Sequence, residues 1–107
     1  ATAFEGAART GAIIANGTED QIEALTGYGK NIGIAYQIRD DLLDWKNEDK
    51  LFNMLIKKSL DPRDVFDKME EMLKEYSEKA RAYLRKLPDN DAKINLQNLV
   101  KFTSFKV

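Results

Sequence analysis

The hydrophobic positions of this 107-residue chain recur every three to four residues almost from end to end. That period is typical of amphipathic helices, and no segment shows the strict alternation of a β-strand. The pattern predicts five helices, at 2–15, 18–46, 51–60, 62–87 and 92–105, and therefore an all-α protein. It is already under way at Ala1 with no capping residue before it, so we expect the chain to start inside an element.

Capping residues mark the boundaries between the predicted helices. The pair Asn16-Gly17 commonly ends a helix. Thr18 then opens the second helix, with Gln21 three residues later, which matches a capping box. Asp61 and Pro62 mark the start of the fourth helix, because proline is favoured at the first helical position.

Each predicted helix carries an apolar stripe through which it is expected to pack. The stripe of the first helix contains Ala3, Phe4, Ala7, Ala8, Gly11 and Ile14. The fourth presents Val65, Phe66, Met69, Leu73, Tyr76, Ala80, Tyr83, Leu84 and Leu87. The last presents Ile94, Leu96, Leu99, Val100 and Phe102. A chain this short buries a limited fraction of its surface, so we expect these wide stripes to need partners from outside it.

The long second helix contains three glycines within seven residues, Gly27, Gly29 and Gly33. Each costs about 1 kcal/mol relative to alanine in a helix interior. Such a cluster indicates close approach of another backbone or a ligand, or else a kink.

The composition restricts the chemistry that the chain supports. Seventeen basic and 18 acidic residues give a net charge of -1, so nucleic acid is not expected as a partner. The absence of cysteine and histidine excludes disulfides, thiolate metal sites, catalytic triads and most zinc sites, and it fits a cytoplasmic protein. Any metal must be held by oxygen, which favours magnesium, manganese or calcium. No apolar run is long enough for membrane insertion.

One face of the long helix concentrates polar chemistry near its end. At about 100° per residue this face holds Gln37, Asp40, Asp41 and Asp44, with Gly33 one turn earlier, whereas the packing seam holds Ala35, Ile38, Leu42 and Trp45. Like charges one turn apart destabilise a helix by about 0.2–0.5 kcal/mol, and no basic residue lies one turn away on that face. A divalent cation bridging carboxylates to a phosphate would relieve the repulsion. Gln37 would then offer its amide to the phosphate or to a metal-bound water.

Plainer interpretations exist for each of these features. An acidic row taken alone is more typical of a solvated helix face. The run Asp64, Asp67, Glu70 and Glu71 is interspersed with basic residues and is predicted to be such a face. Tyr36 is compatible either with the core or with the wall of a substrate cavity. The glycines and apolar residues around Asp40–Asp44 favour a metal and phosphate site there, without naming a reaction.

The segment from Gly29 to Asp44 resembles the second aspartate-rich region of trans-isoprenyl diphosphate synthases, the farnesyl and geranylgeranyl diphosphate synthase type. That pattern is a glycine, a Phe/Tyr-Gln pair, two residues and Asp-Asp-x-x-Asp. In this chain Gly33, Tyr36-Gln37 and Asp40-Asp41-Leu42-Leu43-Asp44 fill every position. Segments 4–13 and 84–102 are similar to other parts of the family, so the likeness covers most of the chain.

The resemblance implies that residues 1–107 are the C-terminal portion of one all-α domain, a helical bundle of the isoprenoid synthase type. It implies a prenyltransferase that joins isopentenyl diphosphate to an allylic diphosphate. Asp40, Asp41 and Asp44 would hold Mg²⁺ ions bridged to the allylic diphosphate, which stabilise the diphosphate as it leaves. Gln37 would contact the same substrate, and Tyr36 would lie near the reacting carbons. A homodimer is also implied.

Several parts of the family pattern are absent from the 107 residues. The first aspartate-rich motif, the basic residues for isopentenyl diphosphate and a Lys-Thr pair all lie upstream of the matched region in the family. In the family, a Gly/Lys-rich loop follows the second aspartate-rich motif. Segment 46–50 is too short to be that loop, so we expect a missing loop between 46 and 59. The chain alone is therefore expected to be inactive. The alternative is a non-catalytic helical subunit, or a fragment, that pairs with a catalytic partner. A third hypothesis is a metal-dependent terpene cyclase, but the spacing from Gln37 to Asp44 favours the synthases.

Overall fold

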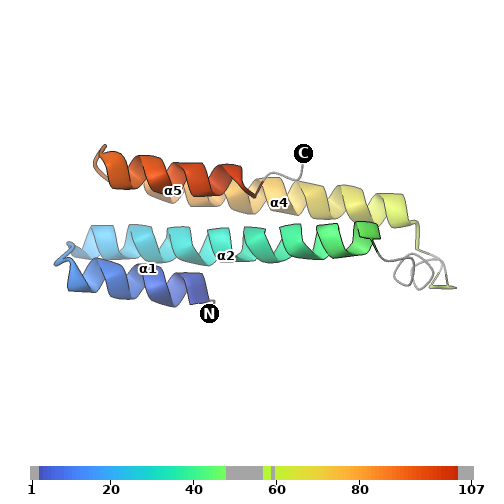
Figure 1. The fold of residues 1–107 in the computed structure, drawn as a ribbon, viewed down its shortest axis with the longest axis horizontal. Coiled ribbons are helices and arrows are strands. Elements are labelled where there is room, and N and C mark those ends of the chain that lie inside the picture. Colours follow the sequence, from blue (N-terminus) through green and yellow to red (C-terminus); the bar gives the residue numbers. More distant parts are fainter. Residues whose placement is uncertain (1–2, 48–56, 59, 104–107) are drawn as a thin grey trace.

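The computed structural model describes residues 3–47, 57–58 and 60–103. Within these residues the chain forms four helices, α1 (Ala3–Ile14), α2 (Glu19–Asn47), α4 (Pro62–Leu84) and α5 (Asp91–Lys101), as Figure 1 shows. The prediction of an all-α protein is therefore confirmed. The predicted helix at 51–60 and the gap expected between 46 and 59 fall on a segment most of which lies outside the described residues.

The predicted capping residues form the expected hydrogen bonds. The Thr18 N–H donates to Oε1 of Gln21 at 3.0 Å, and the Gln21 N–H donates to Oγ1 of Thr18 at 3.2 Å, which completes the capping box. Asn16 adopts a left-handed φ of 55°, which lets the Gly17 N–H reach the Ala12 carbonyl at 2.9 Å and close α1. At the start of α4, Oδ1 of Asp61 accepts from the Arg63 N–H at 2.9 Å. Local sequence therefore determines where these helices begin and end.

Two helices end earlier than the periodicity predicts. α4 ends at Leu84 rather than at 87, because the N–H groups of Lys86 and Leu87 bond to carbonyls three residues back. Pro88 follows and cannot donate to a further helical turn. α5 ends at Lys101, whereas the prediction extended it to 105, into residues beyond the described part.

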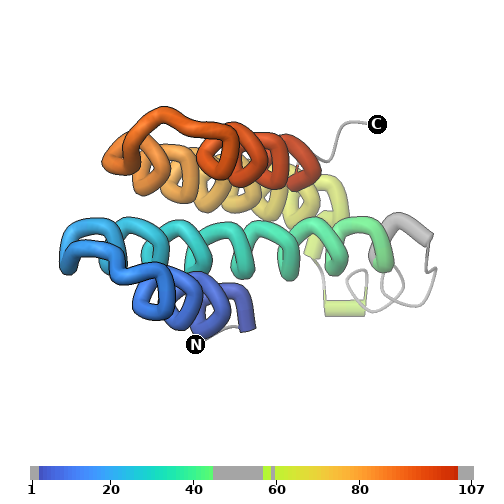
Figure 2. The backbone as a smooth tube through the Cα atoms, turned by 60° about the vertical axis from the view of Figure 1, so that its left-hand side comes forward, coloured from blue at the N-terminus to red at the C-terminus, as the bar shows by residue number. Residues whose placement is uncertain are grey.

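Helix α2 is the centre of the bundle. Successive helices run in opposite directions, with α1 packed on one side of α2 and α4 on another, and α5 covering α4 and part of α2 (Figures 1 and 2). Among the described residues, no helix has the length and apolar character of a membrane span. This arrangement exposes α2 only on the faces that its three neighbours leave uncovered.

Two hydrophobic clusters hold the bundle together. The first joins α2, α4 and α5 through Tyr28, Ile32, Ala80, Leu84 and Val100. The second lies further along α2 and α4 and consists of Ala35, Ile38, Leu42 and Leu73. The predicted seam of α2 is thus buried at each member whose side chain is described, and the predicted stripe of α4 is buried or half-buried throughout.

The stripes predicted for α1 and α5 are partly wrong. On α1 the face toward α2 holds Ala8 and Ala12, whereas Ala3, Ala7, Gly11 and Ile14 are exposed. On α5 only Leu96 and Val100 pack inward, and Ile94, Leu99 and Phe102 are exposed. Apolar residues surround more than half of each helix, so their period alone does not specify which side meets a neighbour.

The chain exposes more surface than a compact monomer of its mass. Its accessible surface is 7530 Å², whereas a globular protein of 12.2 kDa exposes about 6,100 Å². The radius of gyration is 16.3 Å, compared with about 13 Å expected for 107 residues. The excess of about 1,400 Å² is larger than the roughly 800 Å² that one partner contributes to a standard protein interface.

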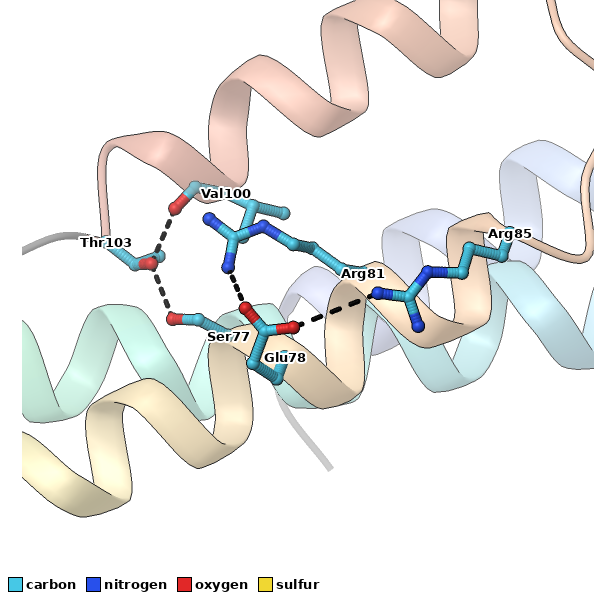
Figure 3. A network of polar contacts seen from close by, with 6 residues as sticks. All are labelled: Ser77, Glu78, Arg81, Arg85, Val100 and Thr103. Carbon is cyan, nitrogen blue, oxygen red and sulfur yellow. Dashed lines mark hydrogen bonds and ion pairs between the residues drawn. The ribbon is translucent and has the colours of Figure 1, made fainter.

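A chain of buried hydroxyls fixes the end of α5 on α4 (Figure 3). The Thr103 hydroxyl donates to the Val100 carbonyl at 2.6 Å, and its oxygen lies 2.6 Å from Oγ of Ser77. The carbonyl can only accept, so the Thr103 hydrogen is committed to it and Ser77 must donate to Thr103. Figure 3 also shows Glu78 beside Arg81 and Arg85. These ion pairs are partly exposed, so they contribute less to stability than the buried hydroxyls.

Two glycines of α2 admit close neighbours, as their clustering predicts. A Cβ on Gly29 would lie 2.5 Å from the Phe4 carbonyl oxygen and 2.9 Å from Cβ of Ala8. A Cβ on Gly27 would lie 2.4 Å from the ring of Tyr83. The backbones of α1 and α2 are therefore in direct contact at Gly29.

Replacing Gly29 with alanine should push α1 away from α2 and lower the free energy of unfolding by about 1–3 kcal/mol. The matched control is Gly11→Ala, because a Cβ there meets no atom within 4 Å. That change should instead stabilise the chain by about 0.5–1 kcal/mol through helix propensity. Urea denaturation checks both values. If Gly29→Ala is as stable as the parent, the close backbone contact is not present in solution.

Candidate functional site

The polar face predicted at the end of α2 lies where α1 no longer covers that helix. Figure 1 shows α2 continuing well beyond the start of α1. On this part of α2, Gln37, Asp40 and Asp44 are exposed and Asp41 is half-buried. The apolar side of the same turns is buried against α4. The structure therefore brings the four predicted side chains to one open stretch, here called the acidic row (Gln37, Asp40, Asp41 and Asp44).

The donor set of the acidic row fits magnesium. All four side chains offer oxygen, and magnesium commonly takes one or two carboxylates together with waters and substrate phosphates. In the described part of the chain, no three acidic side chains already converge as a metal centre. A site of this type is completed by the phosphates of the ligand rather than by protein atoms alone. That these residues bind Mg²⁺ stays a prediction.

Arg39 corrects the expectation that no basic residue offsets the acidic row. Its Nη1 lies 3.8 Å from Oδ1 of Asp40, because the long arginine side chain can span the angular step between adjacent helix positions. Both side chains are partly exposed, so the pair stabilises the helix by at most about 1 kcal/mol. No described residue forms an ion pair with Asp41 or Asp44. The repulsion is therefore only partly relieved.

Tyr36 lies at the rim of the acidic row and contacts two other helices. Its hydroxyl donates to the Leu99 carbonyl of α5 at 3.1 Å, and its ring stacks on Phe4 of α1 with a centroid distance of 5.6 Å. Burial raises the pKa of this hydroxyl; the Arg39 guanidinium acts to lower that pKa, and the Asp40 carboxylate acts to raise it. Tyr36 is thus a packed residue that also responds to charges in the acidic row. Sequence periodicity gave no indication of its contact with Phe4.

Two other charged regions of the described chain offer no comparable site for a metal and a phosphate. The acidic run on α4, Asp64, Asp67, Glu70 and Glu71, is exposed throughout, which confirms the prediction of a solvated face. A groove of about 700 Å³ lies at the opposite end of α2 from the acidic row. Its walls combine Arg9 and Lys86 with Asp20 and Glu23, so no single sign of charge selects an anion or a cation there.

Comparison with known proteins reveals similarity to enzymes that make prenyl diphosphates. Residues 1–60 match the sequence model of the family described as Polyprenyl synthetase. A 42-residue segment is 50% identical to octaprenyl diphosphate synthase from Haemophilus influenzae, covering 39% of this chain and 13% of that protein. A 40-residue segment is 45% identical to farnesyl diphosphate synthase from Bacillus subtilis, covering 37% and 14% respectively.

The structural similarity extends further along the chain. The fold matches the crystal structure of a decaprenyl diphosphate synthase from Rhodobacter capsulatus with a TM-score of 0.75 and 25% sequence identity. The match covers 96% of this chain and 44% of that one. It therefore includes α4 and α5, which lie beyond the residues matched by the family's sequence model. The chain spans less than half of the solved protein.

Because the acidic row is incompletely compensated, removing one charge should stabilise the metal-free chain. Asp44→Asn removes the like-charge pair with Asp40 and a negative charge near the C-terminal end of the helix dipole. We expect the free energy of unfolding to rise by about 0.5–1 kcal/mol. The control is Glu75→Gln, which breaks the 3.2 Å pair with Lys79 and should lower stability by about 0.3–0.5 kcal/mol. Thermal denaturation measures both, and a destabilised Asp44→Asn variant would show that the charges of the acidic row do not repel one another as inferred.

Proposed function

We propose that this chain, which belongs to the polyprenyl synthetase family, carries the part of a prenyl diphosphate synthase site that binds a divalent metal and an allylic diphosphate. The observation that carries the proposal is the acidic row, because its oxygen-bearing side chains follow one another along one stretch of α2 that α1 leaves uncovered. That stretch falls within the residues matched by the family's sequence model. The similar enzymes are named for prenyl diphosphates of several chain lengths.

The proposed reaction joins an allylic diphosphate to isopentenyl diphosphate. Asp40, Asp41 and Asp44 hold Mg²⁺, which supplies Lewis-acid stabilisation of negative charge on the diphosphate. The carbon–oxygen bond of the allylic substrate breaks and its electron pair leaves with diphosphate, which produces an allylic carbocation. The double bond of isopentenyl diphosphate then attacks that carbocation. Diphosphate then takes the released proton. This chemistry needs no histidine, in keeping with a sequence that contains none.

Each polar residue of the acidic row has a distinct task in this proposal. Half-buried Asp41 has less freedom to reorient than the exposed Asp40 and Asp44, so it is the more fixed of the three metal ligands. Gln37 lies one turn before Asp41, where its amide N–H groups can donate to a phosphate oxygen. Tyr36 contacts the site from its rim rather than from within the row.

The complete activity requires groups that the 107 residues do not contain. The first aspartate-rich motif and the basic residues for isopentenyl diphosphate belong to the family pattern upstream of the acidic row. We therefore assign catalysis, in the cytoplasm and in a homodimer, to the complete family site and not to this chain by itself. The second candidate is a non-catalytic helical subunit that pairs with a catalytic partner. The excess surface of about 1,400 Å² supports a need for further polypeptide in either case.

The double variant Asp41→Ala with Asp44→Ala should abolish diphosphate-dependent Mg²⁺ binding. The reason is that only one of the three carboxylates, Asp40, would remain to hold the cation against water. Isothermal titration calorimetry with MgCl₂, in the presence and absence of inorganic diphosphate, measures the effect. The matched control is Asp64→Ala with Asp67→Ala on α4, which removes the same charge from a solvated face. If the first variant binds as tightly as the control, the acidic row is not the metal site.

A further inference from the structure

Arg39 connects the core of the bundle to the acidic row. It follows Ile38, which is buried against α4, and precedes Asp40, which is exposed. The Arg39 side chain is 33% exposed, and Nη1 of its guanidinium lies 3.8 Å from Oδ1 of Asp40. No other basic residue lies within four positions of Asp40 on either side. Arg39 therefore holds a positive charge beside the first carboxylate of the row.

The guanidinium leaves most of its hydrogen-bonding capacity unused. Arginine has five N–H donors in a planar fork. The 3.8 Å separation from Asp40 is short enough for an ion pair but too long for a hydrogen bond. Nε of Arg39 is buried, and among the described residues it is the one buried side-chain nitrogen or oxygen without a hydrogen-bond partner. Buried polar groups of native proteins are nearly always paired, so this donor needs an acceptor that the described residues do not supply.

Buried polar side chains elsewhere in the described bundle are paired. The Tyr28 hydroxyl donates to the Leu96 carbonyl at 3.0 Å. The hydroxyls of Ser77 and Thr103 share a hydrogen bond at 2.6 Å. These bonds cross the interfaces between packed helices, whereas Arg39 lies on the stretch of α2 that carries the acidic row. The unpaired donor is thus found beside the carboxylates to which the proposed ligand binds.

A phosphate bound at Asp40 would supply the acceptor that the guanidinium lacks. Neighbouring ligand oxygens of an octahedral Mg²⁺ lie about 3 Å apart, because each is about 2.1 Å from the cation. A phosphate oxygen that shares Mg²⁺ with Asp40 therefore lies close to the place that Nη1 already occupies. The cation repels the guanidinium from Asp40, and the planar fork matches two phosphate oxygens. Rotation of this partly exposed side chain would bring the fork, Nε included, onto the phosphate.

We propose that Arg39 is a diphosphate-binding residue, which pairs with Asp40 in the metal-free chain and donates to the diphosphate once Mg²⁺ occupies the acidic row. The inference rests on the proposed function, because metal and diphosphate must bind at that row. It also gives the row a selectivity. The same positive charge disfavours Mg²⁺ alone at Asp40 and favours Mg²⁺ that carries diphosphate. The acidic row thus prefers the loaded cation to the free one.

Arg39→Gln should change the affinities for metal and for diphosphate in opposite directions. Isothermal titration calorimetry measures the binding of MgCl₂ alone, and the binding of inorganic diphosphate at a fixed MgCl₂ concentration. The variant should bind Mg²⁺ alone about twofold tighter, because a positive charge beside the cation is lost. It should bind diphosphate about tenfold more weakly, because a charge-assisted hydrogen bond is lost. Arg39→Lys keeps the charge without the fork, so it should lose only part of the diphosphate affinity.

Arg85→Gln is the matched control, because it breaks a comparable pair, 3.9 Å from Glu78, at the end of α4. It should leave both affinities unchanged. If Arg39→Gln binds diphosphate as tightly as the parent or tighter, Arg39 is only a counter-ion of Asp40 and the inference is wrong. A parent chain without diphosphate-dependent Mg²⁺ binding would instead overturn the proposed function, and this inference with it.

The Nε–H signal of Arg39 in a ¹⁵N-labelled sample gives a second readout that does not depend on a folded variant. In the parent chain its proton should move downfield when inorganic diphosphate is added with MgCl₂, and much less with MgCl₂ alone. That shift is expected because a hydrogen bond to a charged acceptor is short and strong. An unchanged signal in a sample where calorimetry detects diphosphate binding would rule out the contact.

Discussion

Helix α2 is buried between α1, α4 and α5, and the small and apolar side chains that allow this burial control the rest of the molecule. Ala24, Ile32, Ala35 and Leu42 are each at most 1% exposed, and Gly29 lets the α1 backbone come within contact distance. Because these residues occupy the sides that meet neighbours, the polar residues near the end of α2 fall on the side that remains. The same helical period that builds the core therefore also assembles the acidic row.

The acidic row works against the stability of the helix that carries it. Asp41 and Asp44 have no ion pair among the described residues, and Asp40 has only a distant contact with Arg39. Some exposed charges of the bundle are offset by pairs such as Glu75 with Lys79 on α4. A local electrostatic cost that packing does not require is typical of a functional site. Together with the family likeness, this cost is the reason for proposing the metal and diphosphate at this end of α2.

Sequence alone predicted the features that depend on nearby residues. The capping box at Thr18 and the seam of α2 follow from fixed spacings, so both were found. The exposed sides of α1 and α5 were mistaken, because the side that meets a neighbour depends on tertiary packing. The ion pair of Arg39 with Asp40 was missed, since helix geometry places backbones and does not limit a long side chain. The metal-binding role of the acidic row stays a prediction that rests on donor chemistry and family likeness.

Paramagnetic broadening by Mn²⁺ tests the central claim, that the acidic row is the metal and diphosphate site, most directly. Mn²⁺ accepts the same oxygen ligands as magnesium and broadens amide signals close to it in a ¹⁵N-labelled sample. With inorganic diphosphate present, the signals of residues 40–44 should broaden first, while Ala24 near the start of α2 and Asp91 at the start of α5 stay sharp. Broadening that is as strong around Asp20 and Glu23, at the opposite end of α2, as around Asp40–Asp44 would contradict the assignment of the metal to the acidic row.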